Sequence, residues 1–219
     1  MITINDTLLK ENVMAELLFE PSLDEASIAV TVKNGIVTLA GSVSNFPEKW
    51  AAERAVKRVS GVEGVAEELT VDFMSSARHS DEDIAGAARR ALEWSATVPE
   101  KSVQIQVEKG WVTLEGVVEW QFQRQDAHNV VARLLGVKGV SNMITLRPQT
   151  TSADVHTNIE AAFKRSSQLD AGRVRVEVAG GAVTLRGHLP NWNEIDAAGL
   201  AAWNAVGVVS VNNQINIGL

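Results

Sequence analysis

Side chains that could perform catalysis or bind a metal are few and scattered in this 219-residue sequence. The absence of cysteine excludes thiol catalysis, disulfides and thiolate zinc sites. The four histidines occupy unrelated positions, and no second histidine follows any of them at i+3 or i+4. Adjacent carboxylates such as Glu67 and Glu68 point to opposite faces of an expected strand, so they form no acid–base pair. We therefore predict that the protein is not an enzyme and uses no cofactor or metal.

The distribution of charge indicates which partners the surface could attract. The chain carries 20 Lys and Arg against 27 Asp and Glu, a net charge of −7. Because phosphate backbones are bound through Lys and Arg, we do not expect nucleic-acid binding. Residues 1–76 hold 12 acidic and 6 basic residues, and four of the acidic ones form a run, Glu63, Glu67, Glu68 and Asp72. Since hard cations bind convergent oxygens, a cation site in this run is an alternative function.

Three arginines near the C-terminal end of the chain are the clearest basic cluster. Because side chains alternate between the two faces of a strand, one face of two neighbouring strands is expected to carry Arg173, Arg175 and Arg186. Such a face could bind a phosphate headgroup or an acidic partner protein. Glu177 is expected on the same face, and its negative charge weakens this prediction.

Three long segments repeat one pattern, and this pattern indicates the elements that carry these residues. Residues 5–71, 80–146 and 151–217 align without a gap, and nine aligned positions are identical in all three. The clearest stretch reads NGIVTLAGSV from Asn34, KGWVTLEGVV from Lys109 and GGAVTLRGHL from Gly180. We therefore predict three domains of one kind, residues 1–72, 77–147 and 150–219.

Each repeat predicts the same order of elements, αββαβ. An N-cap residue (Asn5, Ser80 or Thr151) opens a helix whose apolar residues recur at helical spacing. A strand with strict apolar–polar alternation follows, then a tight turn such as Asn34-Gly35, a second strand, a second helix and a third strand. The hairpin makes the first two strands antiparallel, and the helical crossover makes the last two parallel. The predicted fold class is α+β, with three tandem units that each place two helices on one face of a three-stranded mixed sheet.

Three glycines recur in every repeat, and we predict that their role is structural. The first allows the hairpin turn, the second permits close packing of the second strand, and the third ends the second helix as its C′ residue. They are Gly35, Gly41 and Gly61 in the first repeat, Gly110, Gly116 and Gly136 in the second, and Gly181, Gly187 and Gly207 in the third. They do not form a phosphate-binding loop, because the motif is a strand and lacks Gly-Lys-Ser/Thr.

The Gly-x-Val-Thr-Leu-x-Gly core, followed by an Ala-rich helix, Gly-Val and a final strand, resembles the BON domain family. The resemblance extends over nearly the whole chain. It implies a non-enzymatic bacterial protein, made under osmotic or envelope stress, that binds phospholipid or partner proteins. A cytoplasmic relative that binds potassium implies a cation sensor as one alternative, and a chaperone-like binder of unfolded protein is another. The chain differs from the best-known members because it has three copies and no secretion signal.

The family includes a two-domain lipoprotein, and the resemblance to it implies that exposed apolar residues of the second domain enter anionic membranes. The matching candidates here are Trp94, Val98 and Trp111, with packing between domains as the alternative role. Because no window reaches 18 apolar residues, we expect peripheral membrane contact at most. The N-terminus has no signal-peptide pattern, which predicts a cytoplasmic protein, or a periplasmic one if the chain is a trimmed mature form. The sequence leaves the oligomeric state open.

Overall fold

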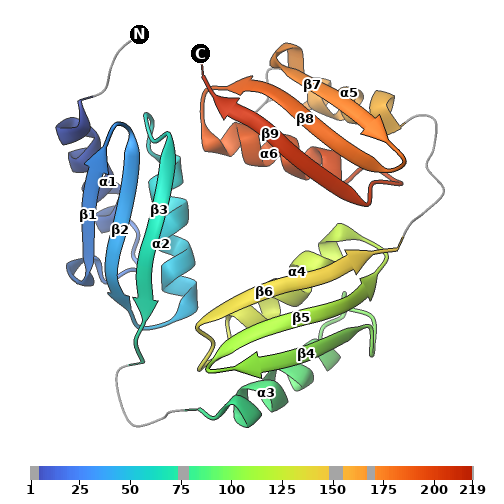
Figure 1. Ribbon diagram of the computed structural model, residues 1–219, viewed down its shortest axis with the longest axis horizontal. Coiled ribbons are helices and arrows are strands. Elements are labelled where there is room, and N and C mark those ends of the chain that lie inside the picture. Colours follow the sequence, from blue (N-terminus) through green and yellow to red (C-terminus); the bar gives the residue numbers. More distant parts are fainter. Residues whose placement is uncertain (1–4, 74–78, 148–154, 167–170, 219) are drawn as a thin grey trace. The chain divides into compact units, whose positions relative to one another are not determined.

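The computed structural model describes residues 5–73, 79–147, 155–166 and 171–218 (Figure 1). Within these ranges the chain forms three αββαβ units, which we call repeat 1, repeat 2 and repeat 3. Repeat 1 contains α1 (Asp6–Phe19), β1 (Ile28–Lys33), β2 (Ile36–Val43), α2 (Phe46–Arg58) and β3 (Gly64–Val71). Repeat 2 contains α3 (Asp81–Glu93), β4 (Val103–Glu108), β5 (Trp111–Val118), α4 (Gln121–Ala132) and β6 (Gly139–Leu146). Repeat 3 contains α5 (Val155–Arg165), β7 (Val174–Ala179), β8 (Ala182–Leu189), α6 (Trp192–Trp203) and β9 (Ser210–Ile217). Short 3-10 helices precede β1 (Glu25–Ser27) and β7 (Ala171–Arg173).

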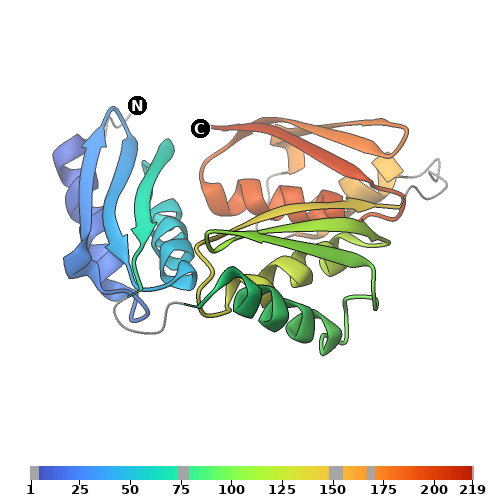
Figure 2. The ribbon, with the colours of Figure 1, turned by 60° about the horizontal axis from the view of Figure 1, so that its bottom comes forward.

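The three sheets share one topology, which confirms the predicted α+β fold. In each sheet the second strand of the repeat lies between the first and the third. β1 pairs with β2 antiparallel, with Thr31 opposite Thr38, and β2 pairs with β3 parallel. The same pairing occurs between β7, β8 and β9. Figure 2 shows that the helices of repeat 2 and of repeat 3 cover one side of their own sheet. We call the uncovered side the open sheet face.

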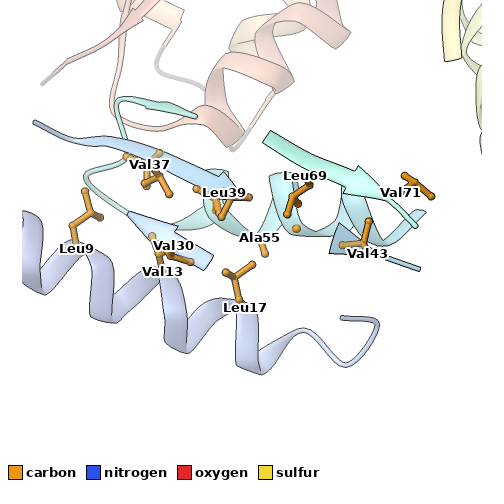
Figure 3. Close-up of a cluster of buried hydrophobic side chains, with 13 residues drawn as sticks. Leu9, Val13, Leu17, Val30, Val37, Leu39, Val43, Ala55, Leu69 and Val71 are labelled. Atoms are coloured by element: carbon orange, nitrogen blue, oxygen red, sulfur yellow. The ribbon is translucent and has the colours of Figure 1, made fainter. Parts of the chain in front are cut away.

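The core of each repeat lies between its sheet and its helices. In repeat 1, Leu9, Val13 and Leu17 are at most 2% exposed and lie on one face of α1, because they are four residues apart (Figure 3). They pack against the buried residues of the central strand β2, including Val37 and Leu39. Each such side chain contributes roughly 1.5–3 kcal/mol by leaving water. A comparable cluster fills repeat 3.

The first helix of repeats 1 and 2 begins with the predicted cap. Asn5 accepts a hydrogen bond from the backbone N–H of Thr7 at 3.0 Å. In repeat 2, Ser80 and Asp83 form a reciprocal capping box. Hydrogen bonds from the Ser80 hydroxyl and backbone N–H hold the pKa of Asp83 below its ordinary value. The capping box therefore stabilises repeat 2 above the unfolded-state pKa, and this contribution is lost as the pH falls through the lower folded-state pKa. The third predicted cap, Thr151, lies outside the described residues.

A carboxylate at the start of the first helix holds the hairpin turn in place. Asp6 accepts hydrogen bonds from the backbone N–H groups of Asn34 and Gly35, at 2.8 and 3.1 Å. Asp81 accepts the same pair from Lys109 and Gly110, at 2.7 and 2.9 Å. Both turn residues have positive φ, as a type I′ hairpin requires. Each carboxylate thus joins the helix to the hairpin through two charge-assisted hydrogen bonds.

Replacing Asp81 by alanine should destabilise repeat 2 by about 1–3 kcal/mol, because two backbone donors lose a charged acceptor. The free energy of unfolding from urea titration measures this loss. The control is Glu82→Ala, which removes the neighbouring carboxylate from the same helical turn and should cost about 0.5 kcal/mol or less. An equal cost for the two variants would show that the hairpin contact contributes nothing.

The third repeated glycine lies further from the second helix than the sequence predicted. α2 ends at Arg58 with Val59 as its C-cap, so Gly61 is not the C′ residue. It lies instead in a turn in which the N–H of Val62 donates to the carbonyl of Val59 at 3.4 Å. Its φ of +91° still requires glycine. Gly136 and Gly207 occupy the equivalent turns of repeats 2 and 3.

Candidate functional site

The acidic run of repeat 1 does not converge on a cation site. Glu67 pairs with Lys49 of α2 at 2.9 Å on the helix side of the sheet. Glu68 is exposed on β3 with the opposite parity, so its carboxylate faces away from Glu67. Within the residues that the structure describes, no group of three or more His, Asp or Glu side chains could hold a metal ion.

The open sheet face of repeat 3 brings two of the predicted arginines together. Arg175 on β7 lies directly opposite Arg186 on β8 in the antiparallel register. Directly opposite residues of such a pair have Cβ atoms about 4.5–5.5 Å apart. Glu177 lies between the two guanidinium groups, 3.5 Å from Nε of Arg175 and 3.7 Å from Nη1 of Arg186. On its other side, Arg186 donates from Nε to Oε1 of Gln214 on β9 at 3.0 Å.

This cluster keeps an excess of positive charge in contact with water. The side chains of Arg175 and Arg186 are 80% and 55% exposed, and that of Glu177 is 42% exposed. One carboxylate therefore faces two guanidinium groups at long ion-pair distances, which are worth little in water. Arg173 has an exposed surface but lies in the short 3-10 helix before β7, where the strand alternation that predicted its direction does not apply. We call Arg175 and Arg186 the arginine cluster.

Trp94 is the most exposed large hydrophobic residue of repeat 2, with 89% of its surface in contact with solvent. It is the C-cap of α3, and its backbone N–H donates to the carbonyl of Arg90 at 3.1 Å. A large, rigid aromatic side chain in this position has the properties of an interface anchor.

Val98 is buried, although the sequence predicted an exposed residue at this position. Its surface is 6% exposed, so the residue is part of the core of repeat 2. The equivalent residue of repeat 1, Leu23, also packs against its core from the loop after the first helix. The loop thus covers the end of the core with an apolar residue, and Val98 cannot enter a membrane while repeat 2 stays folded.

Trp111 is the first residue of β5 and lies on the open sheet face of repeat 2. Its surface is 49% exposed. The indole Nε1–H donates to Oγ of Ser141 at 2.8 Å, and the ring covers Gly139 so closely that an added Cβ would overlap it. The side chain is therefore fixed against β6, with one face of the ring still available.

The structure separates Trp94 from Trp111. Asp81 at the first turn of α3 contacts the hairpin turn that immediately precedes Trp111, whereas Trp94 caps the opposite end of α3. The 13 residues of this helix span about 20 Å. The two tryptophans therefore lie at opposite ends of repeat 2 and do not form one membrane-inserting tip.

Comparison with known proteins identifies the repeating unit. The sequence model of the BON domain matches residues 5–72, 80–148 and 151–218, which together include almost the whole chain. The chain belongs to the BON domain family. It has three tandem BON domains, as the internal repeat indicated.

Among curated proteins, this BON protein is similar to osmotically-inducible protein Y of Escherichia coli strain K12. The two are 28% identical over 145 residues, which cover 64% of this chain and 71% of the relative. The C-terminal domain of CdsD, a structural protein of the type III secretion system of Chlamydia trachomatis, is 17% identical and aligns with 99% of this chain and 100% of its own. Its TM-score is 0.27, too low to support an argument. Among the described residues, no helix combines the length and apolar character needed to cross a membrane.

Proposed function

We propose that this chain is a non-catalytic, stress-related BON protein that binds anionic phospholipid headgroups through the arginine cluster of repeat 3. The similarity to an osmotically-inducible protein supports the stress-related part. The headgroup part rests on one observation: Arg175 and Arg186 lie directly opposite each other with a single carboxylate between them. Two neighbouring guanidinium groups match the oxygens of a phosphate with several charge-assisted hydrogen bonds.

The exposure of the ion pairs makes such binding energetically accessible. A phosphate replaces weak contacts to Glu177 and water, and no buried charge has to be exposed. The strands give the two arginines a fixed separation, which lowers the entropy lost on binding. Binding of this kind is peripheral and weakens as salt screens the charges.

Co-sedimentation with vesicles that contain phosphatidylglycerol tests this function. Each basic residue near an anionic membrane contributes about 1 kcal/mol, so Arg175→Gln combined with Arg186→Gln should weaken partitioning by roughly 30-fold. Glu177→Gln should strengthen partitioning by about fivefold, because it removes the competing carboxylate.

The matched control is Arg147→Gln in repeat 2. Arg147 is also exposed and also has one carboxylate partner, Glu119, at 3.6 Å, but it lies outside the arginine cluster. Its loss should change partitioning by less than about twofold. Equal losses for Arg147 and for the arginine pair would mean that only net charge matters, and binding to neutral vesicles alone would contradict headgroup recognition.

A further inference from the structure

The open sheet face of repeat 3 carries a row of side-chain amides beside the arginine cluster. Alternate residues of β9 point to this face, and they include Asn212, Gln214 and Asn216, which we call the amide row. All three residues are exposed. In the parallel register, Gln214 lies directly opposite Arg186 of the cluster. The amide row is therefore centred beside the arginine pair and extends about 7 Å along the strand to either side.

This row distinguishes repeat 3 from the other two repeats. The equivalent positions are Ala66, Glu68 and Thr70 in β3 and Ser141, Met143 and Thr145 in β6, so neither strand carries an amide there. Asparagine is also among the residues that strands disfavour. Residues that break such a local rule are expected at functional sites.

A neighbouring asparagine of the same strand has a structural role that the amide row lacks. Asn213 points to the helix side of the sheet, where its Nδ2 donates to the carbonyl of Ile195 at 3.1 Å. Asn142 makes the equivalent contact in repeat 2. Within the described part of the chain, the side chains of Asn212 and Asn216 have no such hydrogen-bond partner. Their amides remain available to a ligand.

The chemistry of the amide row complements that of the arginine cluster. The guanidinium groups of Arg175 and Arg186 only donate hydrogen bonds, which suits the oxygens of a phosphate. A carboxamide both donates and accepts and carries no charge, which suits a hydroxyl group. A ligand that has a phosphate at the cluster and hydroxyl groups a few bonds away can therefore engage both sets of side chains.

The charges of this face argue against a headgroup that ends in an ammonium group. Among the described strands of this sheet, the open face has one carboxylate, that of Glu177. It lies 3.5 Å from Nε of Arg175 and 3.7 Å from Nη1 of Arg186. An ammonium group that approached this carboxylate would meet two guanidinium groups of the same sign. Toward β9, the amide row offers it no negative charge.

We propose that the amide row makes the arginine cluster selective for anionic phospholipids whose headgroup carries hydroxyl groups. Asn212 and Asn216 are the specificity-determining residues, because their side chains flank the phosphate site and are not used by the fold. The inference rests on the proposed function, since the cluster must hold the phosphate. It goes further by predicting discrimination between lipids of equal charge.

Co-sedimentation with two kinds of phosphatidylcholine vesicle tests this selectivity on the full chain. One kind contains phosphatidylglycerol and the other an equal mole fraction of phosphatidylethanol, which has the same single negative charge but no hydroxyl group. We expect about tenfold stronger partitioning into the phosphatidylglycerol vesicles. One neutral hydrogen bond is worth a factor of roughly three to ten in affinity, and the amide row supplies more than one.

A double variant assigns the preference to the two asparagines. Asn212→Ala, which introduces the residue of repeat 1, combined with Asn216→Val should bring binding of both lipids to the level of phosphatidylethanol. The control is Gln104→Ala, which removes an exposed amide from the open sheet face of repeat 2 and should leave the preference unchanged. Arg175→Gln combined with Arg186→Gln should weaken binding of both lipids.

The outcomes separate this inference from the proposed function. Equal binding of the two lipids by the unmodified protein, with both still weakened by the arginine changes, would overturn the selectivity and leave the proposed function standing. No effect of the arginine changes would overturn both. A preference that survives in the double asparagine variant would also overturn the inference, as would stronger binding to phosphatidylserine than to phosphatidylglycerol. The comparison of lipids on the unmodified protein remains decisive if the double variant does not fold.

Discussion

Replacing Gly116 by alanine is expected to unfold repeat 2 while repeats 1 and 3 stay folded. The φ of Gly116 is +147°, a conformation that other residues adopt only with strain of about 1–3 kcal/mol. A Cβ at this position would also overlap the carbonyl oxygen of Ser102, which is backbone and cannot move aside. Forced overpacking adds a cost of similar size, so the total is about 3 kcal/mol or more. Units of this size have roughly that much stability to lose.

Two-dimensional NMR of the full chain measures which repeat unfolds. The control is Gly180→Ala, because Gly180 has a φ of +56° but open space around its missing Cβ. Asn34 and Lys109 occupy the equivalent positions in the other repeats, so this change should cost about 1–2 kcal/mol at most. A folded Gly116→Ala variant with unchanged stability would show that the close approach of the two strands is not required.

Replacing Phe163 by alanine is expected to unfold repeat 3 and to abolish vesicle binding with it. Phe163 is 1% exposed at the end of α5 and belongs to the core of this repeat. Truncation of a buried phenylalanine to alanine costs about 3–5 kcal/mol, because it removes apolar contacts and leaves a cavity. Since β7 and β8 pack on this core, their cross-strand arginine pair loses its fixed separation when the core melts.

The matched control for this change is Phe163→Leu. Leu17 and Leu92 occupy the equivalent positions of repeats 1 and 2, so the scaffold accepts leucine there. We expect a loss of about 1.5 kcal/mol or less and retained vesicle binding. Thermal unfolding of the full chain, followed by near-ultraviolet circular dichroism, distinguishes the variants. Vesicle binding by an unfolded Phe163→Ala variant would place the lipid-binding residues outside repeat 3.

The fold could be predicted because three copies of the same local signals reinforce one another. Alternation in β1, β4 and β7 and helical spacing in α1, α3 and α5 gave the elements, and the two-residue turns gave the strand pairing. The prediction that Gly61 is the C′ residue of the second helix was wrong, because a glycine with positive φ suits both a C′ position and a later turn. The hydrogen bond from Val62 to Val59 decides for the turn.

The binding residues were predictable only where strand parity determines the direction of a side chain. Strand alternation predicted that Arg173, Arg175 and Arg186 share one face. The register places Arg175 opposite Arg186, whereas Arg173 lies in the 3-10 helix before β7, where the alternation does not apply. Loop residues have no such rule, so Val98 was expected to be exposed although it is buried. Sequence spacing also could not show that Trp94 and Trp111 lie at opposite ends of α3, since that depends on how the helix packs on the hairpin.

Two further features had a sequence signal that was not used. The carboxylates of Asp6 and Asp81 directly follow the N-cap residues of two repeats, and only the structure shows that they reach the hairpin turns. The small Ala88 stands where repeats 1 and 3 have the larger Val13 and Ile159. Comparison of the repeats at fixed offsets would have shown that the aspartate is shared by two repeats and that Ala88 is smaller than its two counterparts.

The most direct test of anion recognition by repeat 3 is NMR of the arginine Nε–Hε groups of the full chain, titrated with a short-chain phosphatidylglycerol below its micelle concentration. We expect the signals of Arg175 and Arg186 to shift together with one saturation curve, while that of Arg147 does not move. Shifts of equal size at all exposed arginines, or no shift at Arg175 and Arg186 while the protein still binds the lipid, would contradict it.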